Sequence, residues 1–193
     1  MAQWWSIGTG NVLVNSGGLL AGNGRIATNS LVTVNGGISP GKPDNSDVDV
    51  LYSGSQIWGS TGVFNLNINA LPQNGTAGKQ WDLIDLGGGT LTIQDNFTLK
   101  VLGLSASTGF VSSGSYSWLI ASNISAITVG TNIRILLGED VNPATGFGLK
   151  SAGGGLYLDY APVPEPKDYA MILGAITIGL VGYRRWRRTA QFA

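Results

Sequence analysis

The chain has neither cysteine nor histidine among its 193 residues. Without them it can form no disulfide, and it lacks the usual ligands of zinc, haem and iron–sulfur sites. A Ser-His-Asp triad is also excluded, because histidine is its general base. The acidic residues are few and mostly scattered, whereas glycan-cleaving enzymes need clustered carboxylates. We therefore predict a protein that has no catalytic residue and needs no cofactor.

Charged residues are scarce as well, at 11% of the chain, and their signs balance to a formal net charge of zero. The balance is uneven, since residues 1–183 hold 7 Lys/Arg against 11 Asp/Glu and the last four arginines restore neutrality. A mildly acidic body is repelled by phosphate backbones, so we expect no nucleic acid as a partner.

Glycine is abundant, with 30 residues, and it separates short apolar runs between residues 10 and 160. Val-Leu-Val-Asn at residues 12–15 returns as Val-Thr-Val-Asn at residues 32–35, an offset of about 20 residues, which is typical of solenoids. In such folds Asn and Gly turn the corners. Asn-Gly is also a hairpin signal, so an antiparallel meander is the alternative.

Residues 11–24 read Asn-Val-Leu-Val-Asn-Ser-Gly-Gly-Leu-Leu-Ala-Gly-Asn-Gly, and residues 34–41 read Val-Asn-Gly-Gly-Ile-Ser-Pro-Gly. Together with the strand pattern at residues 75–85, they resemble the autotransporter-associated β-strand repeat. The resemblance implies the right-handed parallel β-helix of bacterial surface passengers. We predict an all-β fold of this kind, a β-solenoid, with repeats over residues 1–97. Residues 98–160 then form either a continuation or an antiparallel cap that ends in a hairpin.

The end of the chain combines three features. A linker at residues 161–168 contains a stiff, extended segment, formed by Val163, Pro164, Glu165 and Pro166. A short apolar run follows, from Tyr169 to Tyr183, and then a block of arginines that would stay on the cytoplasmic side. We predict one transmembrane helix with a basic end over residues 169–188. Its anchoring residues are Tyr169, Met171, Ile172, Leu173, Ile176, Ile178, Leu180 and Val181, and its basic stop is Arg184, Arg185, Arg187 and Arg188.

This order of features resembles the PEP-CTERM sorting signal of Gram-negative bacteria. The resemblance implies export across the inner membrane, transient anchoring, removal of the tail by an exosortase-type membrane protease or transpeptidase, and a final place at the cell surface or outside the cell. It also implies an association with exopolysaccharide and biofilm. The family usually has Ser or Thr after Pro-Glu-Pro, whereas this chain has Lys167 and Asp168, which puts the efficiency of processing in doubt. A plain C-terminal anchor is the alternative.

The first residues show neither a basic n-region nor an apolar h-region, as a secretory signal would. We therefore expect either that the chain is the C-terminal part of a longer protein or that its start was assigned too late.

Two further patterns are candidate binding sites. Asp44, Asp47 and Asp49 bring oxygen ligands together in one stretch, which makes them a weak calcium candidate that lacks the EF-hand pattern. Trp58 follows Gln56-Ile57 near a turn, and we expect it to be exposed and to stack on sugar rings.

These observations lead to a non-enzymatic exported protein with a structural or adhesive role at the surface or in the matrix. One alternative is the anchoring part of a larger surface enzyme that acts on polysaccharide. The other is a carbohydrate-binding module that uses Trp58.

Overall fold

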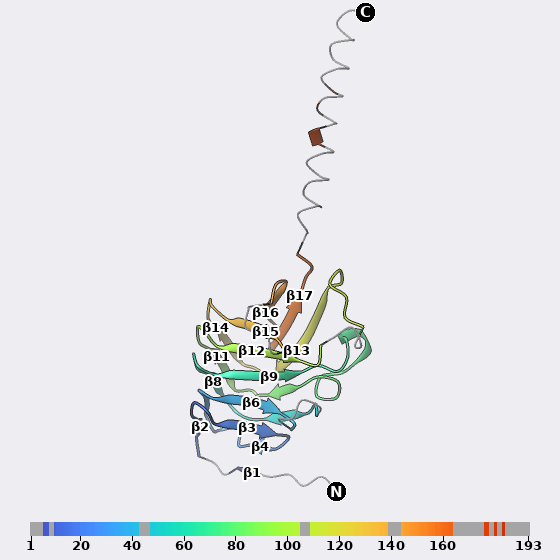
Figure 1. Ribbon diagram of the computed structural model, residues 1–193. Coiled ribbons are helices and arrows are strands. Elements are labelled where there is room, and N and C mark those ends of the chain that lie inside the picture. The colour runs from blue at the N-terminus through green and yellow to red at the C-terminus, as the bar shows by residue number, and fades with distance from the viewer. Residues whose placement is uncertain are drawn as a thin grey trace, which may run out of the picture. The chain divides into compact units, whose positions relative to one another are not determined.

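The computed structural model describes residues 6–7, 10–42, 47–104, 109–138 and 144–163, together with residues 176, 177, 180 and 183. The chain divides into two compact units, Met1–Ala161 and Pro162–Ala193. All described strands belong to the first unit (Figure 1). The first unit includes both the predicted repeats at residues 1–97 and the following residues 98–160.

Three sheets build the first unit. The β2 sheet runs in the order β14 (Ala126–Val129), β11 (Thr90–Ile93), β8 (Gln56–Trp58), β5 (Val32–Val34) and β2 (Val12–Val14). The β3 sheet runs in the order β15 (Arg134–Leu137), β12 (Thr98–Leu102), β9 (Val63–Asn67), β6 (Gly37–Pro40) and β3 (Leu19–Gly22). The seven-stranded sheet contains β1 (Ser6–Ile7), β4 (Arg25–Ile26), β7 (Val50–Tyr52), β10 (Leu83–Asp85), β13 (Tyr116–Ser122), β17 (Gly155–Tyr160) and β16 (Phe147–Ala152).

The chain visits the three sheets in turn, so that successive coils stack and pair in parallel (Figure 1). Val12 pairs with Val32, which is the offset seen between the two motifs of the sequence. The arrangement is therefore a coiled, parallel one, and the alternative of a hairpin meander is excluded for these strands. Coiling continues beyond residue 98, because β14 pairs in parallel with β11 and β15 with β12.

The coils lengthen along the stack, and the added residues fall at one corner. Val32 pairs with Gln56 and Gln56 with Leu91, so the sequence distance between partners grows from each coil to the next. The extra residues lie between the β3 sheet and the seven-stranded sheet, at residues 41–49, 68–82 and 103–115. One of these segments contains the short 3₁₀ helix η1 (Pro72–Asn74). The other two corners stay short, which keeps the β2 and β3 sheets in register.

The core lies inside the coils, where every second side chain of a strand points. Val14, Val34, Trp58 and Ile93 are register partners on successive strands and form one interior column. Tight corners allow this stacking. A Cβ at Gly36 would lie 2.3 Å from the Asn15 carbonyl oxygen of the coil below, so only glycine fits there.

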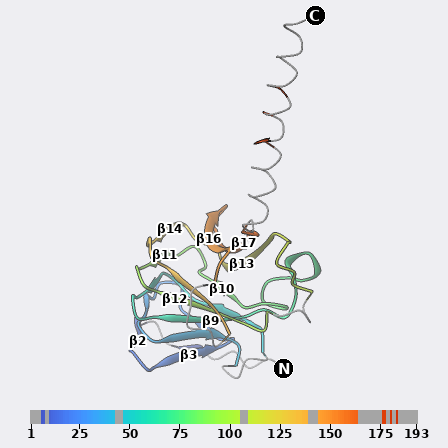
Figure 2. The same cartoon turned by 45° about the horizontal axis from the view of Figure 1, so that its top comes forward.

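An antiparallel hairpin closes the seven-stranded sheet at the far end of the stack. β13 pairs antiparallel with β17, which pairs antiparallel with β16 (Figure 2). Phe110, Tyr116, Phe147 and Tyr160 pack their rings together beside this hairpin. The Tyr160 hydroxyl also donates a hydrogen bond to the Ser112 carbonyl oxygen at 2.8 Å. The cap therefore holds residues 109–115 against the last strands.

The predicted transmembrane helix is wrong. Among the residues that the structure describes, no helix is both long enough and apolar enough to cross a membrane. The physical reason lies in length, because an apolar run of about 15 residues would span about 22 Å as a helix, against a hydrocarbon core of about 30 Å. The predicted fold class and the predicted localisation both included this helix as a membrane anchor, and both are corrected: the described residues form three β-sheets and no membrane-spanning helix.

Candidate functional site

Most residues of the predicted tail sites lie outside the described residues. They are Pro164, Glu165 and Pro166 of the sorting segment, the arginines of the basic stop, and Tyr169, Met171, Ile172, Leu173, Ile178 and Val181 of the anchor. Val163, Ile176 and Leu180 are described, and all three are exposed. Recognition by an exosortase therefore stays a prediction.

The weak calcium candidate is not assembled in the described part of the chain. Asp44 lies outside it, and Asp47 forms an exposed ion pair with Lys42, with 3.8 Å between Nζ and Oδ2. Asp49 accepts a hydrogen bond from the Asn23 side-chain amide at 2.8 Å. Among the described residues, no group of three acidic side chains is placed to hold a metal ion.

Trp58 is a core residue, and the expectation that it is exposed is wrong. Its side chain is 0% exposed and packs against Phe64 and Phe97, with ring centroids 5.4 and 5.0 Å away. The indole N–H donates to Gln56 Oε1 at 2.6 Å, and Gln56 Nε2 donates to Ser53 Oγ at 2.6 Å. Trp58 thus completes a buried polar chain and cannot stack on a sugar ring.

The outer side of the β2 sheet carries a regular column of side chains. Register pairing places Leu13, Thr33, Ile57, Thr92 and Thr128 in one column, with one side chain from each coil. At a strand spacing of about 4.8 Å, this column is roughly 19 Å long. We call it the outer column.

The β2 sheet is also the only one of the three whose described strands hold no charged residue. The β3 sheet carries Lys100 and Arg134, and the seven-stranded sheet carries Arg25, Asp85, Lys150 and Asp159. Within the described part of the chain, the hydroxyls of Thr33, Thr92 and Thr128 make no hydrogen bond. They are free to bind a partner molecule.

A polar hollow adjoins the outer face at a neighbouring corner. It has a volume of about 520 Å³ and is lined by Gly87, Gly88, Asn123, Ile124, Ser125, Gly153 and Gly154. Asn123 donates its side-chain amide to Asp85 Oδ2 at 2.8 Å, and Asp85 Oδ1 accepts from the Gly87 N–H. The hollow therefore offers main-chain and amide groups to a ligand, without an aromatic platform.

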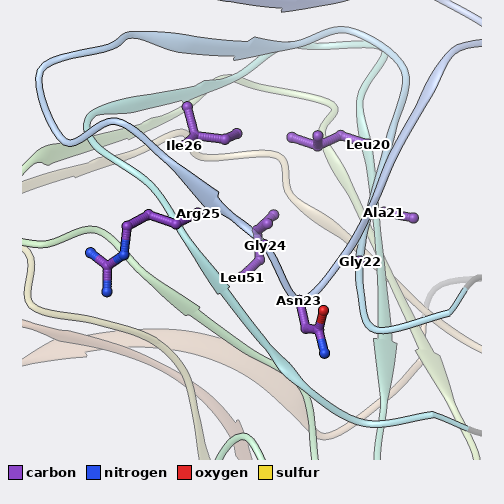
Figure 3. A pocket seen from close by; sticks show the side chains of 8 residues that line it. All are labelled: Leu20, Ala21, Gly22, Asn23, Gly24, Arg25, Ile26 and Leu51. Atoms are coloured by element: carbon purple, nitrogen blue, oxygen red, sulfur yellow. The ribbon is translucent and has the colours of Figure 1, made fainter. Parts of the chain in front are cut away.

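A second cavity lies at the beginning of the stack. Its volume is about 240 Å³, and Leu20 and Ile26 point toward one another across it, while Arg25 points away (Figure 3). The Arg25 guanidinium lies over the Tyr52 ring at 4.5 Å. The cavity is the uncovered interior of the first full coil, because β2 and β3 are edge strands among the described residues. Its apolar lining offers no acid–base chemistry.

One buried carboxyl group stands out electrostatically. Asp82 is fully buried just before β10, and burial raises its pKa from 3.8 to about 7. Hydrogen bonds from the N–H groups of Asn67 and Asp49 act in the opposite direction and lower the pKa. In the described part of the chain, Asp82 belongs to no group of three acidic side chains that could hold a metal ion. Its oxygens accept hydrogen bonds from Asp49 and Asn67, which makes it part of the architecture of the corner.

Comparison with known proteins gives no relative from which a function could be transferred. No protein-family model, no curated protein and no solved structure matches this chain. The resemblances to the sorting signal and to the autotransporter-associated repeat therefore stay predictions, and function has to be argued from the residues.

Proposed function

We propose that the protein is a non-catalytic structural or adhesive scaffold, which binds an uncharged polysaccharide through the outer face of the β2 sheet. The observation that carries this proposal is the outer column, five strands long and without a charged residue in any of those strands. Matrix exopolysaccharide is the class of partner that the sequence resemblance suggested.

Charge supports a neutral partner. Binding removes water from the contact, and burying a charged side chain without a counter-ion costs free energy. The β2 face has no such side chain, and it gains no Coulomb attraction from a polyanion or a polycation. A neutral polymer therefore suits this face better than the β3 sheet, which carries Lys100 and Arg134.

The side chains of the outer column support the same conclusion. Thr33, Ile57 and Thr92 are β-branched and stiff, so they lose little rotamer freedom on contact. Their methyl groups can pack against the C–H faces of sugar rings, and the free threonine hydroxyls can exchange hydrogen bonds with sugar hydroxyls. Each single contact is weak, but repetition along the column adds them over one polymer chain.

The test is a binding assay with the full chain on microcrystalline cellulose as an uncharged probe and on alginate as a charged one. We expect retention on cellulose only. Thr92→Glu places a charge in the middle of the outer column, and we expect it to reduce retention at least tenfold. Thr98→Glu is the matched control, because Thr98 is the same residue type, half-buried and outward-facing on the β3 sheet.

The proposal fails if the two variants bind equally well, or if wild type binds alginate and not cellulose. Urea unfolding of both variants shows whether either loses stability. A loss of binding by Thr92→Glu without a loss of stability assigns the effect to the face itself.

A further inference from the structure

Asp82 joins neighbouring coils at the corner where the chain is longest. Its Oδ1 accepts a hydrogen bond from the Asp49 N–H at 3.1 Å. Its Oδ2 accepts from the Asn67 N–H at 2.8 Å and from Asn67 Nδ2 at 3.0 Å. Asp49 in turn bonds Asn23 of the first full coil. One carboxyl group thus connects the second coil to both ends of the segment at residues 68–82.

The charges around this carboxyl group are few. Among the described residues, no cationic side chain pairs with Asp82, and Asp49 is the charged group that acts on it from the neighbouring coil. Lys42 and Asp47, on the same corner segment as Asp49, are exposed and pair with each other. Asp85, further along the chain in β10, bonds Gly87 and Asn123 instead. An ionised Asp82 is therefore a buried charge that only N–H groups stabilise.

The side-chain amide of Asn67, which contacts Asp82, is only partly satisfied by hydrogen bonds. Its side chain is buried and its Nδ2 donates to Asp82, whereas its Oδ1 has no hydrogen-bond partner among the residues that the structure describes. If the amide turned over, Oδ1 would face Asp82 Oδ2. Two acceptors cannot face each other without repulsion, so that orientation requires a proton on the carboxyl group. The orientation of the amide is therefore coupled to the protonation of Asp82.

We propose that Asp82 and Asn67 form a pH-dependent clasp: the protonated carboxyl donates to Asn67 Oδ1 and holds the segment at residues 68–82, and loss of the proton to solvent turns the amide over and makes this segment easier to open. The clasp is independent of the proposed binding to polysaccharide, because it lies at the corner between the β3 sheet and the seven-stranded sheet, whereas the outer column lies on the face of the β2 sheet.

The direction follows from linkage. The carboxyl has a pKa of about 7 when buried and an ordinary value near 3.8 when the segment opens. Between these values the closed form binds the proton more tightly, so closure is favoured at low pH and weakens as pH rises. From pH 5 to pH 8, the equilibrium constant for opening increases about 100-fold.

Hydrogen exchange of the two main-chain N–H groups that contact Asp82 measures this opening. After correction for intrinsic exchange, we expect the protection of the Asn67 and Asp49 amides to fall about 100-fold from pH 5 to pH 8. In Asp82→Asn, which cannot titrate, the protection should not change with pH. Asp85→Asn is the control and should keep the wild-type decrease.

Carbon-13 NMR of the wild-type carboxyl groups and nitrogen-15 NMR of the Asn67 side chain test the clasp even if Asp82→Asn does not fold. We expect one carboxyl to titrate near pH 7, and the Asn67 side-chain signals to move with it. If the Asp82 carboxyl itself titrates near pH 4, or if the protection stays constant from pH 5 to pH 8 in wild type, the proposal is overturned. Asn67 signals that do not respond to the titration refute the turning of the amide.

Discussion

Replacing Trp58 with phenylalanine separates a structural role of this side chain from a role in binding. The ring stack with Phe64 and Phe97 survives in part, but the indole N–H is lost. Gln56 Oε1 then stays buried without its donor, which costs about 1–3 kcal/mol. The smaller ring also leaves a gap in the core, so we expect Trp58→Phe to lose about 2–4 kcal/mol of unfolding free energy.

A double-mutant cycle isolates the hydrogen bond between Trp58 and Gln56. Gln56→Leu alone leaves the indole N–H unpaired, whereas the double variant removes donor and acceptor together. We therefore expect the double variant to be about 1–3 kcal/mol more stable than the sum of the two single changes predicts. Urea unfolding followed by far-UV circular dichroism gives all four free energies without relying on tryptophan fluorescence.

The result that refutes this reasoning is additivity of the two changes, or a Trp58→Phe variant as stable as wild type. Binding to cellulose supplies the second arm. At temperatures where Trp58→Phe is folded, we expect it to bind cellulose as wild type does. A folded Trp58→Phe variant that no longer binds would show that the indole contacts the polymer after all.

Two further changes test the corners of the coils. Gly36→Ala puts a methyl group against main-chain oxygens of the coil below, so we expect a loss of about 1–3 kcal/mol in urea unfolding, whereas Gly148→Ala, which meets no atom within 4 Å, should change stability little. At another corner, Asp95 accepts hydrogen bonds from the N–H groups of Asn132 and Thr131 and from the Thr131 hydroxyl, and these lower its pKa. The ionised Asp95 therefore stabilises the fold at pH values above the pKa that Asp95 has in the unfolded chain, and this stabilisation is lost as the pH falls. We expect Asp95→Asn to melt below wild type at pH 6, and the difference to shrink at pH 3; a constant difference would contradict the assignment.

The strand pairing of the first coils could be predicted from the sequence, because two copies of one motif at a fixed offset indicate which residues pair. Val12 and Val32 are partners, as the offset between the two Val-Asn motifs indicates. The pattern could not be followed further because residues 41–49 and 68–82 enlarge one corner and break the period. Nothing in a single sequence marks such residues as an insertion into a coil rather than as a change of fold.

The faces of β8 show why the candidate site could not be predicted. Gln56 is polar, and Ile57 and Trp58 that follow it are both large and apolar. Because Ile57 and Trp58 point to opposite faces of the strand, the sequence allows either face to be the core. Only the pairing of Trp58 with Val34 and Ile93 fixes the tryptophan inside and turns Ile57 outward. The outer column was missed for the same reason, since its threonines share a face only after the register is known.

The uneven corners and the regular β2 face have one structural cause. The outer column requires that each coil enter the β2 sheet in the same register. The corners on both sides of this sheet are short, such as residues 35–36 and 53–55, and leave little freedom to change that register. Added residues between the β3 sheet and the seven-stranded sheet do not disturb this register, because the chain has a whole strand of the seven-stranded sheet in which to recover it. Differences between the coils are therefore confined to the long corner, which contains the buried Asp82. The β2 face stays regular, with one uncharged side chain per coil in the outer column.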